Sequence, residues 1–267
     1  MRGRHVSLSP ARRLVADYMW FSRDLPLVTV ERRIDLASLI EVRKRAAERP
    51  IWAAVFAKAF AVVCMEEPRL RRAYVKLPWP SFYEYESPVA SIILEREHDG
   101  EEALLSALVK SPERLPLSEI SQAVRRQAAS PVAEVPEFSR MLRVARLPRP
   151  LRRMIWWTVL NWGRLRANYF GTFLLTSLMS ENAISKRILS PLPAVLTYGV
   201  FDADGCIEVR ITFDHRVMDG LVAARALSRL EQVLNGAIAD EIAAGLPEAG
   251  CGVGTEEQGS PHWLAAT

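Results

Sequence analysis

Cysteine is scarce in this chain of 267 residues, which contains only three. Cys64, Cys206 and Cys251 show no C-x-x-C spacing, so the sequence indicates neither a zinc site nor a disulfide framework. An odd and low number of cysteines is typical of a protein in a reducing compartment. We therefore expect a cytoplasmic protein with no metal site. Cys64 lies in an apolar segment, which predicts a small core residue.

Long apolar runs are also missing. No stretch reaches the ~20 apolar residues of a membrane span, and residues 1–20 carry Ser, Arg and Asp where a signal peptide needs an apolar core,. The formal net charge is only +4, which on its own is too small to indicate a nucleic-acid partner. We predict that the protein neither spans a membrane nor binds nucleic acid.

What the chain does contain fits one large domain with a substantial core, since 49% of its residues are hydrophobic,. Helical periodicity predicts helices near 10–21, 35–48, 51–65 and 117–128 and after 220, and alternation predicts strands near 27–34, 88–95, 103–109, 194–201 and 206–213,. This mixture predicts an α/β (α+β) fold for residues 1–244. Residues 245–267, rich in Gly, Ala, Glu and Pro, are predicted to form a flexible C-terminal tail,.

One histidine stands at a predicted strand-to-helix corner. Residues 208–213 alternate between apolar and polar side chains, and the apolar residues after Gly220 recur at helical spacing,. His215 lies between these two segments, where its imidazole can project into a cleft while the strand behind it stays rigid. An ordinary histidine titrates near pH ~6.5, so it can accept and return a proton at neutral pH. A lone histidine is more often structural, so the alternative of a structural His215 stays open at this point.

The string D-H-R-V-M-D-G at 214–220 is more specific than a lone histidine. It resembles the motif of the catalytic domain of 2-oxo acid dehydrogenase acyltransferases, a family in the chloramphenicol acetyltransferase-like superfamily. Segments 9–16, 27–39, 58–68 and 173–178 resemble that family's opening helix, first strand and next helix, buried helix and F-T-I-S-N-L-G segment, in the same order. The resemblance implies a two-layer sandwich, with a mixed sheet flanked by helices. It also implies a homotrimer, or a higher multiple of trimers, with each active site between two subunits.

The resemblance further implies the chemistry of acyl transfer. His215 would act as general base on a thiol, hydroxyl or amine acceptor, and the nucleophile formed would attack a thioester carbonyl. Thr176 matches the family's oxyanion donor, with Ser177 beside it as a second candidate. The segment departs from the family pattern, because Ser177 replaces the family's Asn and Met179 replaces its Gly.

Three more residues are expected to support this site. Asp219 resembles the motif aspartate, which orders the loop in the family and is usually held by an arginine. Arg12 or Arg13, in the segment that resembles the opening helix, is the candidate partner, and Arg216 is expected to support the corner. None of the three is predicted to act as the base.

The acyl donor is left open by the sequence. We find no lipoyl domain or subunit-binding domain before residue 6, so we expect a stand-alone catalytic domain without a covalently bound cofactor. Its acyl group would come from coenzyme A, from an acyl carrier protein, or from a lipoyl domain on another chain.

A cationic segment, at about 138–168, looks like an insertion into the family's domain. No acidic residue occurs between Glu137 and Glu181, while the segment contains eight arginines and three tryptophans. This composition suits a membrane interface, an acidic carrier protein or the phosphates of coenzyme A. It also fits a segment that packs on the domain with its arginines solvated. Pro148 and Pro150 predict two short helices around a bend.

Three functional hypotheses follow from these observations. The leading one is an acyltransferase that uses a thioester donor. The second is a non-catalytic oligomeric scaffold or binding protein that keeps the fold, which the altered residues after Thr176 favour. The third is a membrane-peripheral acyltransferase that acts on an apolar acceptor, with the region 140–166 making the membrane contact.

Overall fold

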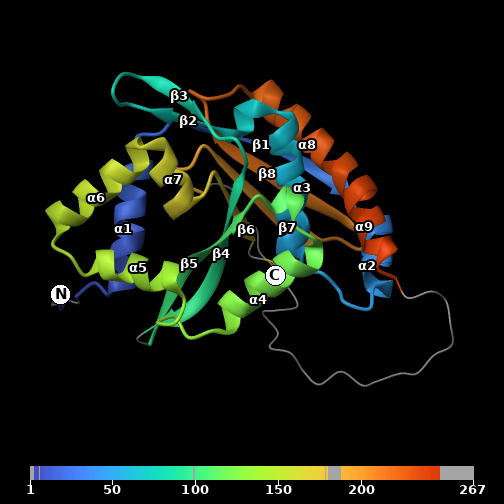
Figure 1. Cartoon of the computed structure of the whole chain (residues 1–267), viewed down its shortest axis with the longest axis horizontal. Coiled ribbons are helices and arrows are strands. Elements are labelled where there is room, and N and C mark those ends of the chain that lie inside the picture. The colour runs from blue at the N-terminus through green and yellow to red at the C-terminus, as the bar shows by residue number, and fades with distance from the viewer. Residues whose placement is uncertain (1–2, 6, 99, 178, 180–187, 247–267) are drawn as a thin grey trace.

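A six-stranded mixed sheet divides the molecule into two helical layers in the computed structural model (Figure 1), which describes residues 3–5, 7–98, 100–177, 179 and 188–246. Its strands, in spatial order, are β1 (Leu27–Asp35), β8 (Cys206–Asp214), β7 (Ala194–Phe201), β6 (Phe173–Ser177), β4 (Val89–His98) and β5 (Glu101–Lys110). The β4–β6 and β6–β7 pairs are parallel and the other pairs are antiparallel. The predicted mixed fold with flanking helices is therefore confirmed.

The buried helix α3 (Trp52–Glu66) covers the centre of one sheet face, as its apolar circumference predicts,. Phe56 stacks on Tyr198 of β7 with ring centroids 4.2 Å apart, and Phe60 meets Phe173 of β6 edge-on at 4.9 Å. Cys64 is fully buried in the same helix, which confirms its predicted core position. The same layer holds α2 (Ala37–Arg45), α4 (Leu117–Ala129), α8 (Gly220–Val233), a π-helical turn (Leu234–Ile238) and α9 (Ala239–Ala244).

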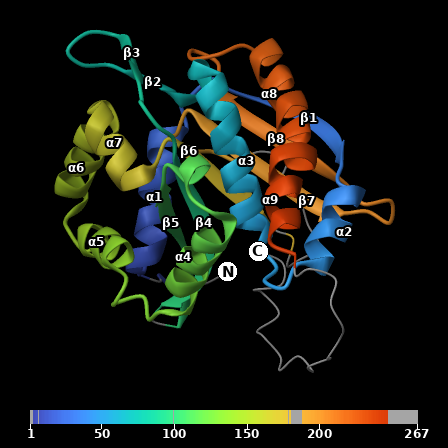
Figure 2. The ribbon, with the colours of Figure 1, turned by 45° about the vertical axis from the view of Figure 1, so that its right-hand side comes forward.

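The second layer lies over the β4–β5 side of the opposite face (Figure 2) and consists of α1 (Pro10–Ser22), α5 (Pro136–Ala145), α6 (Arg149–Asn161) and α7 (Gly163–Phe170). Trp156 of α6 is its centre, with ring centroids 6.0 Å from Tyr18 and 4.7 Å from Phe170. Aromatic pairs in such offset or edge arrangements stabilise a core beyond their buried area. This packing joins the cationic segment to the opening helix.

The cationic segment contains three helices, so the prediction of two was wrong. The predicted break at the prolines is present, because Pro148 is the N-cap of α6. The second break falls at Trp162, whose extended backbone (φ −110°, ψ 105°) separates α6 from α7. A small sheet of β2 (Arg72–Val75) and β3 (Ser81–Glu84) was also not predicted, because four-residue strands carry little periodic signal,.

The predicted C-terminal tail falls mostly outside the residues that the structure describes. Of the predicted tail at 245–267, only the first two residues lie within the described ranges, and Cys251 lies outside them. Among the described residues, no helix is both long enough and apolar enough to cross a membrane.

A buried ion pair ties α6 to α1. Arg152 donates to the Asp17 carboxylate through Nε and through Nη2, the latter at 3.3 Å from Oδ1, and its Nη1 donates to the Leu147 carbonyl at 3.2 Å. Asp17 and Arg152 are only 1% and 6% exposed. The alternative in which the arginines of this segment are solvated therefore fails for Arg152.

We expect D17A to lower the free energy of unfolding by about 3–5 kcal/mol, because it leaves the Arg152 guanidinium buried without its carboxylate. Urea denaturation followed by circular dichroism measures this change. The matched control is D24A, which removes an exposed carboxylate paired with Arg23 and should cost at most about 1 kcal/mol. Equal effects of D17A and D24A would show that the buried pair does not hold the two helices together.

Candidate active site

Asp214, the last residue of β8, organises the corner before α8. Its carbonyl accepts hydrogen bonds from Val217 N at 2.9 Å and Met218 N at 3.4 Å. Its carboxylate accepts the Arg216 backbone N–H at 3.0 Å, and Arg216 Nη2 at 2.6 Å. The Asp214 side chain is nearly buried, so these bonds are shielded from water,. The turn after β8 is thereby fixed from within.

His215 projects from this corner with one ring nitrogen engaged. Its backbone N–H donates to the Pro26 carbonyl at 2.9 Å, which ties the corner to the chain before β1. Its Nδ1 lies 3.1 Å from the Met218 carbonyl oxygen and 3.6 Å from Asp219 Oδ1. Both of these oxygens can only accept, so the arrangement favours a proton on Nδ1 and a free lone pair on Nε2. The side chain is 48% exposed, which leaves Nε2 accessible to a substrate.

Arg216, expected to support the corner, pairs with Asp214 at the end of β8. Its guanidinium chelates the Asp214 carboxylate and lies over the Tyr74 ring, 4.3 Å from the ring centroid. Hydrogen bonding to Asp214 raises the pKa of Arg216 above its ordinary value. Arg216 is therefore a permanent cation that holds the turn against β2.

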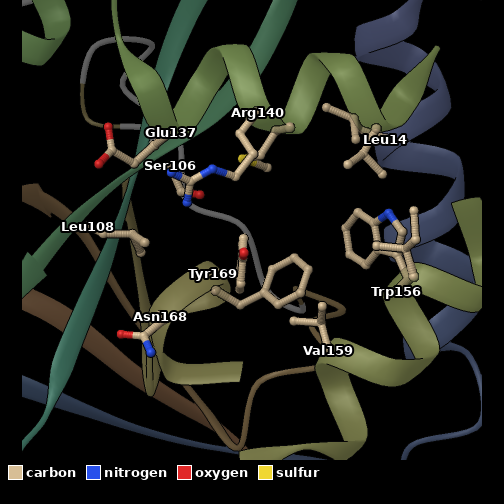
Figure 3. A pocket seen from close by; sticks show the side chains of 13 residues that line it. Leu14, Ser106, Leu108, Glu137, Arg140, Trp156, Val159, Asn168 and Tyr169 are labelled. Atoms are coloured by element: carbon tan, nitrogen blue, oxygen red, sulfur yellow. The ribbon is translucent and has the colours of Figure 1, made fainter. Parts of the chain in front are cut away.

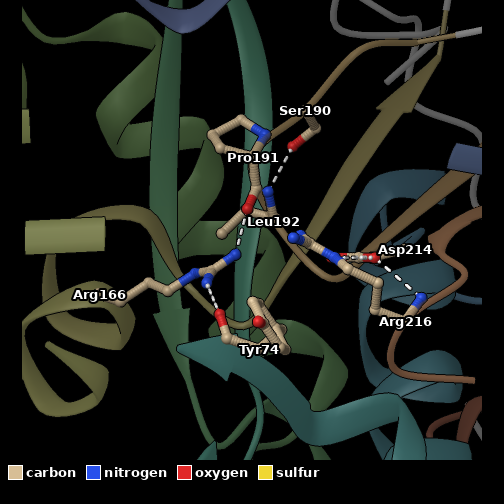
Figure 4. A network of polar contacts seen from close by, with 7 residues as sticks. All are labelled: Tyr74, Arg166, Ser190, Pro191, Leu192, Asp214 and Arg216. Carbon is tan, nitrogen blue, oxygen red and sulfur yellow. Dashed lines mark hydrogen bonds and ion pairs between the residues drawn. The ribbon is translucent and has the colours of Figure 1, made fainter. Parts of the chain in front are cut away.

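A second arginine in this network, Arg166, was not predicted. It comes from α7, is buried, and donates to the carbonyls of Pro191 and Tyr74, the latter at 3.4 Å (Figure 4). Burial lowers its pKa below the ordinary value. These bonds fasten the segment before β7 to β2, beside the Asp214–Arg216 pair. The sequence offered no signal for this role, because Arg166 is one of eight arginines in the cationic segment.

The two hydroxyl candidates on β6 point to opposite faces of the sheet, because successive strand side chains alternate. Thr176 lines a cavity between the sheet and α1. Ser177 lies on the α3 side, where its Oγ accepts the Met179 N–H at 3.2 Å and hydrogen-bonds with the buried Tyr198 phenol. Of the two, Thr176 has the side chain that faces a cavity.

The strand register keeps Thr176 and His215 apart within one chain. Thr176 is opposite Thr197 on β7, and Thr197 is opposite Arg210 on β8. Arg210 precedes His215 by five residues, which at about 3.3 Å per residue is roughly 16 Å along the strand. The two residues also stand two strands apart in the sheet. They can act on one substrate only if a second copy brings its own His215 or Thr176 to the site.

Asp219 is the N-cap residue of α8, and its side chain is 79% exposed. Its predicted pairing with Arg12 or Arg13 is not found among the described contacts of the single chain. Arg12 is exposed on α1, and Arg13 Nε donates to the Leu8 carbonyl at 3.0 Å. Within one chain, Asp219 lies beside His215, with its Oδ1 3.6 Å from Nδ1.

Solved structures share this fold at low sequence identity. One is a truncated catalytic core of the 2-oxoacid dehydrogenase multienzyme complex from Thermoplasma acidophilum (18% identity, TM-score 0.64), with 88% of this chain and 99% of that chain aligned. Another is the cubic core of a pyruvate dehydrogenase multienzyme complex (16%, TM-score 0.63), covering 89% and 93% of the two chains. A third is the dihydrolipoamide acetyltransferase of Azotobacter vinelandii (16%, TM-score 0.62), again covering 89% and 93%.

No protein-family model matches the sequence, and a search of curated proteins finds no match either. The solved structures nevertheless show that the chain has the fold of acyltransferase catalytic cores. This likeness extends over nearly nine tenths of its length. The fold expected from the D-H-R-V-M-D-G string is confirmed.

We expect the neutral form of His215 to carry its proton on Nδ1, because the Met218 carbonyl lies beside that nitrogen. Ring ¹⁵N chemical shifts from NMR on histidine-labelled protein distinguish the two tautomers. D219N should leave the tautomer unchanged, since the carbonyl acceptor remains. A proton found on Nε2 instead would contradict the geometry described above.

Proposed function

We propose that the protein is an acyltransferase that moves an acyl group from a thioester to a thiol, hydroxyl or amine acceptor. The observation that carries this proposal is the His215 corner, where Nδ1 is held by the Met218 carbonyl and Nε2 is free to accept a proton,. The fold, shared with acyltransferase cores, supports the same reaction class.

In the proposed reaction, His215 Nε2 removes the acceptor's proton, and the resulting nucleophile attacks the thioester carbonyl. The tetrahedral oxyanion accepts a hydrogen bond from the Thr176 hydroxyl. The intermediate then collapses, the carbon–sulfur bond breaks, and the imidazolium returns the proton to the departing thiolate. Asp219, beside Nδ1, stabilises the imidazolium while it carries the proton,.

The complete site in this proposal lies between two copies of the chain. Because the strand register holds the two residues apart within one chain, the His215 of one copy must meet the Thr176 of another. We infer a homotrimer or a higher multiple of trimers, supported by the cubic core assembly among the structures of the same fold. A closed ring of this kind repeats one heterologous contact, so each copy gives a histidine to one junction and a threonine to the next.

One solved structure of this fold adds support for the catalytic assignment. In the Azotobacter vinelandii acetyltransferase, a serine, a histidine and an asparagine four residues after that histidine were investigated for roles in the catalytic mechanism. In this chain Asp219 follows His215 by the same four residues. A hydroxyl residue, Thr176, faces a cavity on another strand.

The donor in this proposal is an acyl thioester of coenzyme A, with a carrier-protein or lipoyl-domain thioester as the alternative. None of these would be bound covalently by the protein between reactions. Coenzyme A carries phosphates that match the exposed arginines of the cationic segment. We propose that the reaction takes place in the cytoplasm, on the basis of the low cysteine content.

We expect H215A to lower the transfer rate by about 10²–10⁴-fold, through loss of the general base, and T176A to lower it by about 10²–10³-fold, through loss of the oxyanion donor. Release of thiol from a panel of acyl-coenzyme A donors measures both effects. The matched control is S177A, which removes the neighbouring hydroxyl on the opposite sheet face. If no donor shows a rate that depends on His215, the scaffold hypothesis is favoured over the enzyme.

Mixing the two inactive variants tests whether the site is shared between copies. When equal amounts of H215A and T176A are mixed, unfolded and refolded together, about one subunit junction in four combines an intact histidine with an intact threonine. Activity should therefore return to roughly a quarter of the native value. If the mixture stays as inactive as its parts, the two residues do not meet across a subunit junction.

A second candidate, a membrane-peripheral form of the same enzyme, is favoured by one exposed surface. Met154, Trp157 and Trp162 are 58%, 44% and 63% exposed on or beside α6. Exposed arginines occur in the same segment, at positions 140, 143, 146, 149 and 164. Exposed tryptophans among arginines suit the headgroup region of an anionic bilayer. We define this set as the Arg/Trp surface and propose that it docks the enzyme on anionic lipid.

The Arg/Trp surface should bind vesicles of phosphatidylcholine with phosphatidylglycerol, and not vesicles of phosphatidylcholine alone. Each arginine near an anionic surface contributes about 1 kcal/mol, so R143Q and R149Q should each weaken binding about fivefold. Vesicle flotation measures this. The control is W79S, which removes a 69% exposed tryptophan outside the surface. Membrane docking is excluded if native protein stays unbound with phosphatidylglycerol present.

A further inference from the structure

A cavity of about 260 Å³ lies directly beside Thr176. It lies between the sheet and α1, and its walls are mainly apolar side chains, including Leu14, Ile93 and Leu174. Tyr18, also in the wall, hydrogen-bonds to Ser190 at 2.8 Å, and burial raises its pKa to about 12, so it stays neutral. The cavity thus offers a ligand a largely apolar surface next to the proposed oxyanion donor, with the exposed Glu95 as the charged residue in its lining.

A second cavity, of about 190 Å³, continues away from Thr176 into the helices of the cationic segment. Figure 3 shows side chains of α1, β5, α5, α6 and α7 around it. Five residues line both cavities: Leu14, Ser106, Met141, Trp156 and Phe170. At most one layer of side chains therefore separates the two spaces, and together they extend from Thr176 to residues of α5 and α7.

The outer cavity has polar groups only at part of its wall. Glu137, Arg140 and Asn168 lie there, and Arg140 is positioned over the Tyr169 ring, 5.4 Å from the centroid. Between this end and Thr176 the shared wall is apolar except for Ser106, which is 8% exposed. A ligand that fits this path has one reactive end at Thr176 and an unbranched apolar body.

We propose that the two cavities form one channel that binds the hydrocarbon chain of a medium- or long-chain acyl group. The proposal rests on the proposed function, since it assumes that the thioester carbonyl lies at Thr176. From there the chain runs past Leu14 and Trp156 and ends among α5, α6 and α7. The helices of the cationic segment would thereby select the acyl group that the enzyme transfers.

The sizes of the cavities support a chain much longer than acetyl. An apolar cavity of about 150 Å³ accommodates benzene, which corresponds to about 25 Å³ per carbon and hence to about ten carbons in the inner cavity and about eighteen in the two cavities together,. Acetyl would leave nearly all of the apolar wall without a contact. Each buried CH₂ is expected to raise kcat/KM by up to about fourfold until the channel is full.

Two substitutions on different helices test the channel. V159F on α6 and V144F on α5 each place a ring in the outer cavity. Each should lower the ratio of kcat/KM for dodecanoyl-coenzyme A over acetyl-coenzyme A by tenfold or more. The matched control, T158F, places the same ring on the exposed side of α6, next to Val159, and should leave this ratio unchanged.

A binding measurement separates this proposal from the proposed reaction. Calorimetric titration with dodecanoic acid should give one site per chain in the native protein and in H215A, and binding at least tenfold weaker in V159F. If dodecanoic acid binds in this way but no donor is turned over, the channel stands and the transferase assignment fails. If transfer depends on His215 but acetyl and dodecanoyl donors are used equally, the channel is wrong. Absence of dodecanoic acid binding to the native protein also overturns it.

Discussion

The register of β6, β7 and β8 is the constraint on which the rest of this structure depends. It carries the chain's proposed base to one end of the sheet and its proposed oxyanion donor toward the other. A change of one residue in the register of a strand would turn its side chains to the opposite face of the sheet. The packing of β6 and β7 on α3 opposes such a change, because it would expose the apolar side chains that contact this helix. A single copy therefore presents two half-sites, and the proposed chemistry requires an assembly.

Buried polar groups that are hydrogen-bonded to neighbouring segments hold the proposed base, His215, in position. Asp214 accepts hydrogen bonds from three backbone N–H groups and from the Arg216 guanidinium, and Arg166 fastens the neighbouring loop through carbonyl groups. Such bonds are strong where water is excluded, and leaving one partner alone is costly. This network orients the backbone at His215. The contact between His215 Nδ1 and the Met218 carbonyl then orients the imidazole ring.

The helices of the cationic segment have two different sides. Their inner sides, with Trp156 and Phe170, pack against α1 and line the cavities beyond Thr176. Their outer sides carry the exposed tryptophans and arginines of the Arg/Trp surface. The Asp17–Arg152 pair anchors α6 on the opening helix and so holds both sides of α6 in place. An acyl channel and a lipid-facing surface on the same helices would suit an enzyme whose substrates have long apolar chains.

The sequence by itself determined the local elements and the identity of the corner. The alternation at 208–213, the helical stripe after Gly220 and the all-round apolar helix at 51–65 each correspond to an observed element, because these patterns depend on neighbouring residues alone,. The string around His215 predicted the fold. The break at Trp162 and the short strands β2 and β3 escaped prediction, because no periodic signal marks them.

Only the tertiary structure decided which distant residues meet. It turned Thr176 to a cavity and Ser177 to the α3 side, it buried Arg152 against Asp17 and Arg166 against two carbonyls, and it left Asp219 without the expected arginine inside one chain. All eight arginines of the segment look alike in the sequence. Burial and partner geometry distinguish them, and both arise from contacts between segments that lie far apart along the chain.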